Sequence, residues 1–179
     1  MSTKILSKKT IQTAHAFDMQ RLAVRLPDGR ERDYDLIDHA DAVTILAVDQ
    51  EGFALFVSQF RIGAEKELLE LPAGVMDAGE DPALAARREL REETGMDCKE
   101  LTFLGGFYMS AGYSNEFMRC YLAKNLLKAA LEQDEDEFLA LSRIKLDEVY
   151  AMVWSGQIED SKTLAALLFA LPLLKQEGL

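Results

Sequence analysis

Apolar and polar positions predict β structure over the first 60 residues of the chain. Residues 20–26 and 30–37 alternate on either side of a Pro-Asp-Gly turn signal, which indicates a hairpin within an N-terminal β segment spanning residues 1–40. Two runs rich in Val, Ile and Leu follow at residues 42–48 and 53–60. Their continuous apolar character, and the Gln-Glu-Gly break between them, predict a second and buried hairpin.

The remainder of the chain combines short strands with helices. Strong helix formers fill residues 82–94, between Asp81, a suitable N-cap, and Gly95, a residue type that commonly ends helices. Further strands are expected at residues 68–74, 101–109, 117–123 and 138–144, and further helices at 146–155 and 161–175, the last disturbed near Pro172. Strands before and after a central helix, with helices at the end, predict an α/β/α layered domain over residues 41–179.

Composition excludes several classes of protein. Hydrophobic residues make up 49% and charged residues 28% of the sequence, which is typical of a soluble domain. No apolar run reaches the roughly 18–20 residues that span a bilayer, and the first ten residues lack the apolar core of a secretion signal. Cys98 and Cys120 form neither a disulfide framework nor a zinc pattern. We therefore expect a cytoplasmic protein with no membrane partner.

The net charge of −11 bears on possible ligands. Such a surface repels nucleic acid, whose binding depends on Lys and Arg at the phosphates, so we expect no nucleic-acid partner. It would also repel a small phosphorylated substrate unless a cation such as a divalent metal intervenes. The charge could equally serve only to keep the protein soluble.

Three carboxylates share one face of the predicted central helix. Glu89, Glu92 and Glu93 are spaced i, i+3 and i+4, so they repel one another unless a cation joins them. Mg²⁺ and Mn²⁺ prefer such oxygen ligands, and the flexible loop around Gly74 could bring the carbonyl of Ala73 to the same point. The alternative is a solvated helix face on which Arg88 pairs with Glu92.

The segment around this helix, GVMDAGEDPALAARRELREETGM, resembles the Nudix box G-x5-E-x7-R-E-U-x-E-E-x-G-U, in which U is aliphatic. Every specified position is matched, namely by Gly74, Glu80, Arg88, Glu89, Leu90, Glu92, Glu93, Gly95 and Met96. The resemblance implies a Nudix-type α/β/α sandwich with a mixed sheet. It also implies hydrolysis of a nucleoside diphosphate linked to another group, with Mg²⁺ as the cofactor and Mn²⁺ as an alternative.

The same resemblance assigns roles to these residues. Glu89, Glu92, Glu93 and the Ala73 carbonyl are similar to the family's metal ligands. Arg88 and Glu80 are expected to support the ligands, and the glycines at 74 and 95 to shape the loop and the end of the helix.

Two features outside the box resemble the ADP-ribose pyrophosphatase branch of the family. One is Gln-Phe-Arg followed by Glu-Leu-Pro-Ala-Gly, in which Arg61 would contact a substrate phosphate, although it could simply be a surface residue at a strand end. The other is the loop at residues 108–116, where Ala111 replaces the proline of the branch and so weakens the assignment to ADP-ribose. Glu116 in this loop would touch metal or substrate, or form a salt bridge at the start of a strand.

The resemblance also covers the acidic segment at residues 134–138 and the N-terminal segment. Glu135, then Glu137, is the expected catalytic base, with Glu92 a further candidate on the helix; acidic loops are otherwise simply solvated. The segment 1–40 is expected to form a homodimer. There, Phe17 and Tyr34 would stack on the base of the nucleotide, or else belong to the core.

These features predict a metal-dependent pyrophosphohydrolase whose small-molecule nucleotide substrate is ADP-ribose, cleaved to AMP and ribose 5-phosphate. One alternative changes only the substrate, to GDP-mannose, another nucleotide sugar or a dinucleotide. The other alternative is a non-catalytic nucleotide sensor. Such sensors typically lack the glutamates of the box, all of which are present here.

Overall fold

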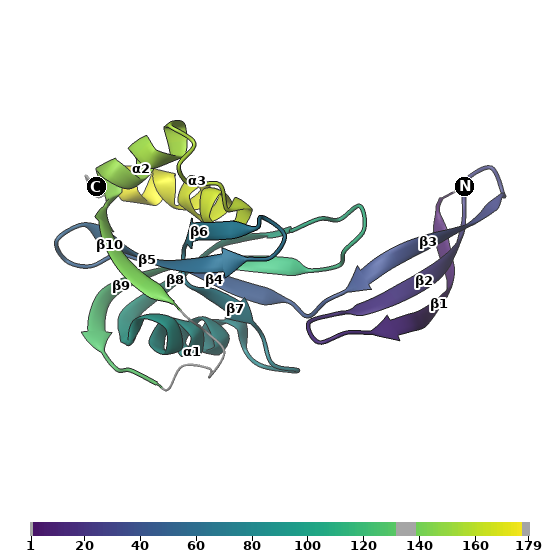
Figure 1. The fold of residues 1–179 in the computed structure, drawn as a ribbon, viewed down its shortest axis with the longest axis horizontal. Coiled ribbons are helices and arrows are strands. Elements are labelled where there is room, and N and C mark those ends of the chain that lie inside the picture. The colour runs from purple at the N-terminus through teal and green to yellow at the C-terminus, as the bar shows by residue number, and fades with distance from the viewer. Residues whose placement is uncertain (1, 132–138, 177–179) are drawn as a thin grey trace. The chain divides into compact units, whose positions relative to one another are not determined.

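The computed structural model describes residues 2–131 and 139–176. Two compact units make up the chain (Figure 1). The first contains Met1–Asp41 together with Tyr108–Phe117, and the second contains Ala42–Phe107 together with Met118–Leu179.

The first unit is built on a three-stranded antiparallel sheet in the order β1-β2-β3. Its strands are β1 (Lys4–Thr13), β2 (Asp18–Arg25) and β3 (Glu31–Asp38). The β2–β3 hairpin is the one that the alternation predicts. β1 is an addition to that hairpin, because every residue of β1 is exposed and the strand therefore has no buried face to leave a pattern in the sequence.

The second unit contains two sheets. One has the order β7-β4-β9-β8 and the other β10-β5-β6. The first is formed by β4 (Ala42–Ala47), β7 (Ala73–Val75), β8 (Met96–Tyr108) and β9 (Phe117–Lys128), and the second by β5 (Phe53–Arg61), β6 (Lys66–Glu70) and β10 (Ala140–Lys145). β4 pairs parallel with β9 and antiparallel with β7, so the first sheet is mixed.

The predicted buried hairpin of residues 42–48 and 53–60 is wrong. β4 and β5 lie in different sheets, and the pairing between the two runs is confined to the turn, where Val48 bridges Ala54 and the Asp49 N–H donates to the Phe53 carbonyl. A continuous apolar run shows that a strand is covered on both faces, but it does not identify the neighbour to which the strand is hydrogen-bonded.

The second unit also contains the helices α1 (Pro82–Thr94), α2 (Leu146–Trp154) and α3 (Ser161–Gln176). α1 lies on one side of the sheets, and α2 and α3 lie on the other, so the predicted layered architecture is confirmed (Figure 1). α3 continues as a helix through Pro172, where a disturbance was expected. No helix in the described part of the chain is both long enough and apolar enough to cross a bilayer.

β4 is the central strand of this core. Val43, Ile45 and Ala47 are buried in one cluster with Ala86 and Leu90 of α1. Successive side chains of a strand point to opposite faces, so the intervening residues face the other layer, where α3 packs against β4. The strand next to it, β7, and the loop that leads into α1 are thereby held against a rigid element.

Candidate active site

The beginning and the end of α1 follow from its local sequence. The Asp81 side chain accepts hydrogen bonds from the N–H groups of Ala83 and Leu84 at 2.9 and 3.2 Å, and Pro82 occupies the first turn. Gly95 ends the helix in the left-handed conformation, with φ of 70°. The predicted helix and both of its end signals are confirmed.

Two of the predicted ligands lie on the buried face of this helix. Glu89 and Glu93 are 7% and 4% exposed and share that face with Ala85, Ala86 and Leu90. A carboxylate removed from water is unfavourable unless hydrogen bonds or cations compensate for the lost solvation. The contacts of these two side chains therefore define the site.

Gly74 allows Glu89 to lie directly against the backbone of β7. A Cβ atom added at this glycine would be 2.1 Å from the Glu89 Cδ and 2.2 Å from each carboxylate oxygen. No side chain can be accommodated at such distances. The first glycine of the box is therefore required for the close approach of the carboxylate to the strand.

Pairing with β4 decides which way the backbone of Ala73 faces. The Ile45 N–H donates to the carbonyl of Pro72 at 2.8 Å, and the next pair along the register is Thr44 with Ala73. Hydrogen-bonded and non-hydrogen-bonded pairs alternate along an antiparallel ladder, so the N–H and C=O of Ala73 both face away from β4. The N–H donates to Glu93 Oε2 at 3.0 Å. The carbonyl that is predicted as a ligand therefore leaves the sheet on the same side.

Arg88 joins the loop before α1 to the carboxylates on it. Its Nε and Nη2 donate to the two oxygens of Glu80 at 3.0 and 2.9 Å, and Nη2 also donates to the Val75 carbonyl at 3.1 Å. Its Nη1 donates to Glu89 at 2.6 Å and to Glu92 at 3.0 Å. These hydrogen bonds, which Arg88 donates and Glu80 accepts, lower the pKa of Glu80 and raise the pKa of Arg88. Both groups are therefore charged at neutral pH, and their supporting role at the site stays a prediction.

A pocket of about 340 Å³ opens beside these residues. It is lined by Gln59, Arg61, Ala73, Gly74, Val75, Asp77, Arg88, Glu89 and Glu92. The structure thus brings Arg61, from the end of β5, to the same pocket as the carboxylates of the box. Asp77 was not anticipated, because it occupies one of the unspecified positions of the motif.

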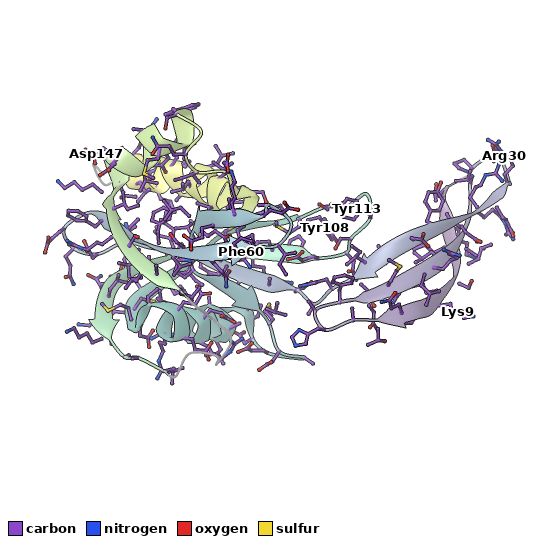
Figure 2. The ribbon with its side chains drawn as sticks, in the orientation of Figure 1. Lys9, Arg30, Phe60, Tyr108, Tyr113 and Asp147 are labelled. Atoms are coloured by element: carbon purple, nitrogen blue, oxygen red, sulfur yellow. The ribbon has the colours of Figure 1, made fainter. Side chains whose placement is uncertain are left out.

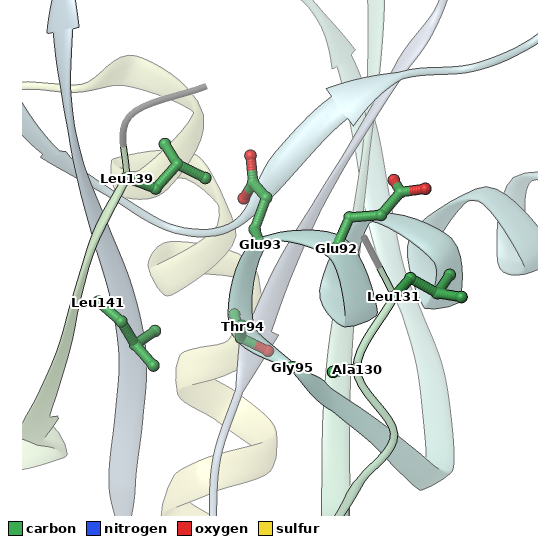
Figure 3. Close-up of a pocket in the computed structure, with 8 residues that line it drawn as sticks. All are labelled: Glu92, Glu93, Thr94, Gly95, Ala130, Leu131, Leu139 and Leu141. Carbon is green, nitrogen blue, oxygen red and sulfur yellow. The ribbon is translucent and has the colours of Figure 1, made fainter. Parts of the chain in front are cut away.

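A second pocket, of about 410 Å³, lies at the C-terminal end of α1 (Figure 3). Its lining comprises Glu92, Glu93, Thr94, Gly95, Ala130, Leu131, Leu139 and Leu141. Glu92 lines both pockets, and its side chain rises from the same turn as that of Glu93. The predicted bases Glu135 and Glu137 lie outside the described residues.

The remaining predicted substrate contacts belong to the first unit. Phe17 and Tyr34 are partly exposed there, so their proposed stacking on a base stays a prediction. Glu116 lies in the segment Tyr108–Phe117, and its carbonyl accepts from the Met109 N–H at 3.1 Å. The same segment presents two exposed aromatic side chains, Tyr108 and Tyr113 (Figure 2). The side-chain role of Glu116 also stays a prediction.

The donor chemistry around α1 suits a hard divalent cation. Arg88 forms ion pairs with three carboxylates, those of Glu80, Glu89 and Glu92, so three formal negative charges surround its single positive charge. Among the described residues, no three side chains of Asp, Glu, His or Cys lie close enough together in this structure to hold a metal ion. Arg88 bonds to two of the predicted ligands, so it neutralises part of this charge and leaves an excess that an added cation would balance.

Comparison with known proteins identifies the family. A model of the NUDIX domain matches residues 38–167, and the chain belongs to this family. The chain is 36% identical over 169 residues to the ADP-ribose pyrophosphatase of Bacillus subtilis (strain 168), a match that covers 93% of this chain and 91% of that protein. It is 37% identical over 171 residues to the methanol dehydrogenase activator of Bacillus methanolicus, with 92% of each chain covered.

A solved structure shares the fold over the full length. The crystal structure of an ADP compounds hydrolase superimposes with a TM-score of 0.88 at 26% sequence identity, covering 99% of this chain and 97% of the other. The predicted Nudix fold is therefore confirmed, and the chain is an enzyme, a Nudix hydrolase.

Proposed function

We propose that this Nudix hydrolase cleaves the diphosphate of a nucleotide sugar, with ADP-ribose, split into AMP and ribose 5-phosphate, as the first candidate. The observation that carries the proposal is the shared pocket, in which Arg61 faces the same space as the carboxylates of the box. Carboxylates that would hold a cation, in the same pocket as a guanidinium, suit a diphosphate, because the cation and the guanidinium can both neutralise phosphoryl oxygens. Full-length similarity to an ADP-ribose pyrophosphatase supports this choice of substrate.

Mg²⁺, or Mn²⁺ in its place, is the proposed cofactor, held by Glu89, Glu92, Glu93 and the Ala73 carbonyl. When bound, the metal neutralises charge on phosphoryl oxygens and makes water a better nucleophile. In this proposal Arg61 binds and orients the diphosphate. Arg88 keeps the ligand side chains in position, since it bonds to Glu89 and Glu92 as well as to the loop.

The proton released by the attacking water requires a carboxylate base. Glu92 is the proposed base among the described residues, because it lines both pockets. Glu135 and Glu137 remain the proposed bases of the acidic segment.

The test is a hydrolysis screen with Mg²⁺, in which the products are separated by chromatography. The panel contains ADP-ribose, GDP-mannose, UDP-glucose, NADH, diadenosine polyphosphates and nucleoside triphosphates. We expect ADP-ribose to be cleaved fastest, EDTA to abolish turnover, and Mg²⁺ to restore it. Faster cleavage of GDP-mannose would favour the second candidate, which Ala111 leaves open because it departs from the ADP-ribose pattern. No turnover of any conjugate with either metal would refute the proposal.

We also propose that residues 1–40 mediate a homodimer and that the enzyme works in the cytoplasm. Large apolar side chains are exposed on the first unit, namely Ile5, Leu6, Ile11, Phe17 and Tyr34. β1 is in addition an edge strand whose outer backbone groups can pair with another chain. The molar mass measured by light scattering should be twice that of one chain. The double substitution Ile5→Lys/Ile11→Lys should reduce this molar mass to that of one chain. A parent protein that is monomeric at micromolar concentration would contradict the dimer.

A further inference from the structure

A cluster of charges with a buried centre joins Arg61 to the beginning of α3. The Arg61 Nε and Nη2 donate to the two oxygens of Glu70 at 2.7 and 2.6 Å, which is a bidentate ion pair. The Lys162 ammonium group donates to the same carboxylate and lies 3.1 Å from Asp160. We call these four residues the Arg61–Lys162 cluster. It connects the end of β5 with β6 and α3.

Burial makes the centre of the cluster, the pair of Glu70 and Lys162, sensitive to the loss of either charge. Glu70 is 1% exposed and Lys162 is 6% exposed. Removing one partner of a buried ion pair is costly because the other charge is left uncompensated. Burial alone would raise the pKa of Glu70, but Arg61 and Lys162 outweigh burial and hold that pKa below its usual range.

The beginning of α3 is also bonded to the short segment between β6 and β7, just before the residues that line the pocket. The Thr163 hydroxyl accepts from the Leu71 N–H at 2.9 Å and donates to Asp160 at 2.7 Å. Leu71 lies two residues before Ala73, whose N–H donates to Glu93. The turn of α3 that carries Lys162 is therefore held in a defined position relative to the pocket.

We infer that Lys162 is a positioning residue, which acts through Glu70 to orient Arg61 in the pocket. The Nε and Nη2 groups of Arg61 both donate to Glu70. The orientation of that carboxylate therefore sets the orientation of the guanidinium. Lys162 bonds to Glu70 from the side of α3 and holds the carboxylate in this orientation. The inference rests on the proposed function, in which Arg61 binds the diphosphate.

Lys162 also sets the charge that the substrate meets. Arg61 and Lys162 balance Glu70 and Asp160, so the cluster is formally neutral. Without Lys162 the same group carries one negative charge next to a pocket that must accept an anion. The loss should therefore weaken substrate binding more than it slows the chemical step.

The experiment compares Lys162→Met with Lys175→Met, which removes an exposed lysine from the same helix. With ADP-ribose and Mg²⁺, we expect Lys162→Met to raise KM about tenfold with a smaller change in kcat. Lys175→Met should behave as the parent, and Lys162→Arg should recover most of the lost affinity. A Lys162→Met variant with the parent's KM would overturn the inference.

A double-mutant cycle with Arg61→Met separates positioning from a general structural role. If Lys162 acts through Arg61, Lys162→Met should have little further effect on kcat/KM in the Arg61→Met background. Independent, multiplicative effects would overturn the inference. If Lys162→Met does not fold, Lys162→Gln replaces it in the cycle, and unfolding of both variants would mean that the role is structural only.

Failure of the proposed function would be visible in the parent protein. If the parent binds ADP-ribose in calorimetry but does not hydrolyse it, the proposed function fails, and the cycle is scored on Kd instead. If the parent is active and the cycle is additive, only the role of Lys162 fails. A parent protein that neither binds nor cleaves any conjugate would refute both the proposed function and the role of Lys162.

Discussion

Replacing Glu93 by Gln is expected to lower kcat for nucleotide-sugar hydrolysis by roughly a thousandfold or more, because it removes one charge from the proposed metal site. The substitution keeps the size of the side chain. The new amide oxygen can still accept from the Ala73 N–H, which now donates to Glu93 Oε2 at 3.0 Å. The melting temperature without metal should therefore stay close to that of the parent, and the loss should be one of function.

The measurement is steady-state hydrolysis of ADP-ribose over a range of Mg²⁺ concentrations, with thermal melting in parallel. The matched control is Glu148→Gln, which removes an exposed glutamate from α2 and should leave kcat unchanged. Mg²⁺ should raise the melting temperature of the parent and of the control, since a ligand that binds only the folded state stabilises it. This rise should be absent in Glu93→Gln. Hydrolysis by Glu93→Gln at the rate of the parent would show that the carboxylate is not a metal ligand.

Gly74→Ala should lower kcat by about a hundredfold, the scale on which a displacement of about 1 Å costs activity. The added methyl group would meet the Glu89 carboxylate at 2.1 to 2.2 Å. β7 cannot move away easily, because the backbone of Gly74 is paired with Val43 of the buried central strand. The side chain of Glu89 therefore has to leave its position, and with it a proposed ligand.

Gly63→Ala is the control for this substitution, since a Cβ at that exposed turn meets no atom within 4 Å and its φ is not positive. It should match the parent in both kcat and melting temperature. For Gly74→Ala, the decisive comparison is the activation by Mg²⁺, whose half-saturating concentration should rise as kcat falls. Unchanged kcat and unchanged Mg²⁺ dependence would mean that the carboxylate can be displaced without consequence, which would remove Glu89 from the proposed site.

The central helix shows how much local sequence can determine. Asp81, Pro82 and Gly95 set its beginning and its end, and the structure uses each of them as expected. Capping and helix propensity act within a few residues, so these signals are complete in the sequence itself. The spacing of Glu89, Glu92 and Glu93 is likewise a local property of the helix.

Sheet membership could not be obtained in this way. The apolar runs at β4 and β5 predict two buried strands correctly, but they pair with different partners in different sheets. β1 has apolar residues but no apolar alternation that would mark its limits, because its residues are held by backbone pairing rather than by burial. Strand pairing depends on backbone groups that every residue carries. The order of apolar and polar residues therefore indicates a strand's pairing only when one face of that strand is buried.

The sequence by itself thus determined the layered class of the fold, the limits of the central helix and the set of carboxylates on it. Only the tertiary structure decided how those carboxylates are held, with Glu89 against Gly74, Glu93 on the Ala73 N–H, and Arg88 between loop and helix. It alone joined Glu70 to Lys162, which is 92 residues away along the chain. The reason is physical: helix signals are local, whereas the partner of a buried charge is chosen by which distant segments pack around it.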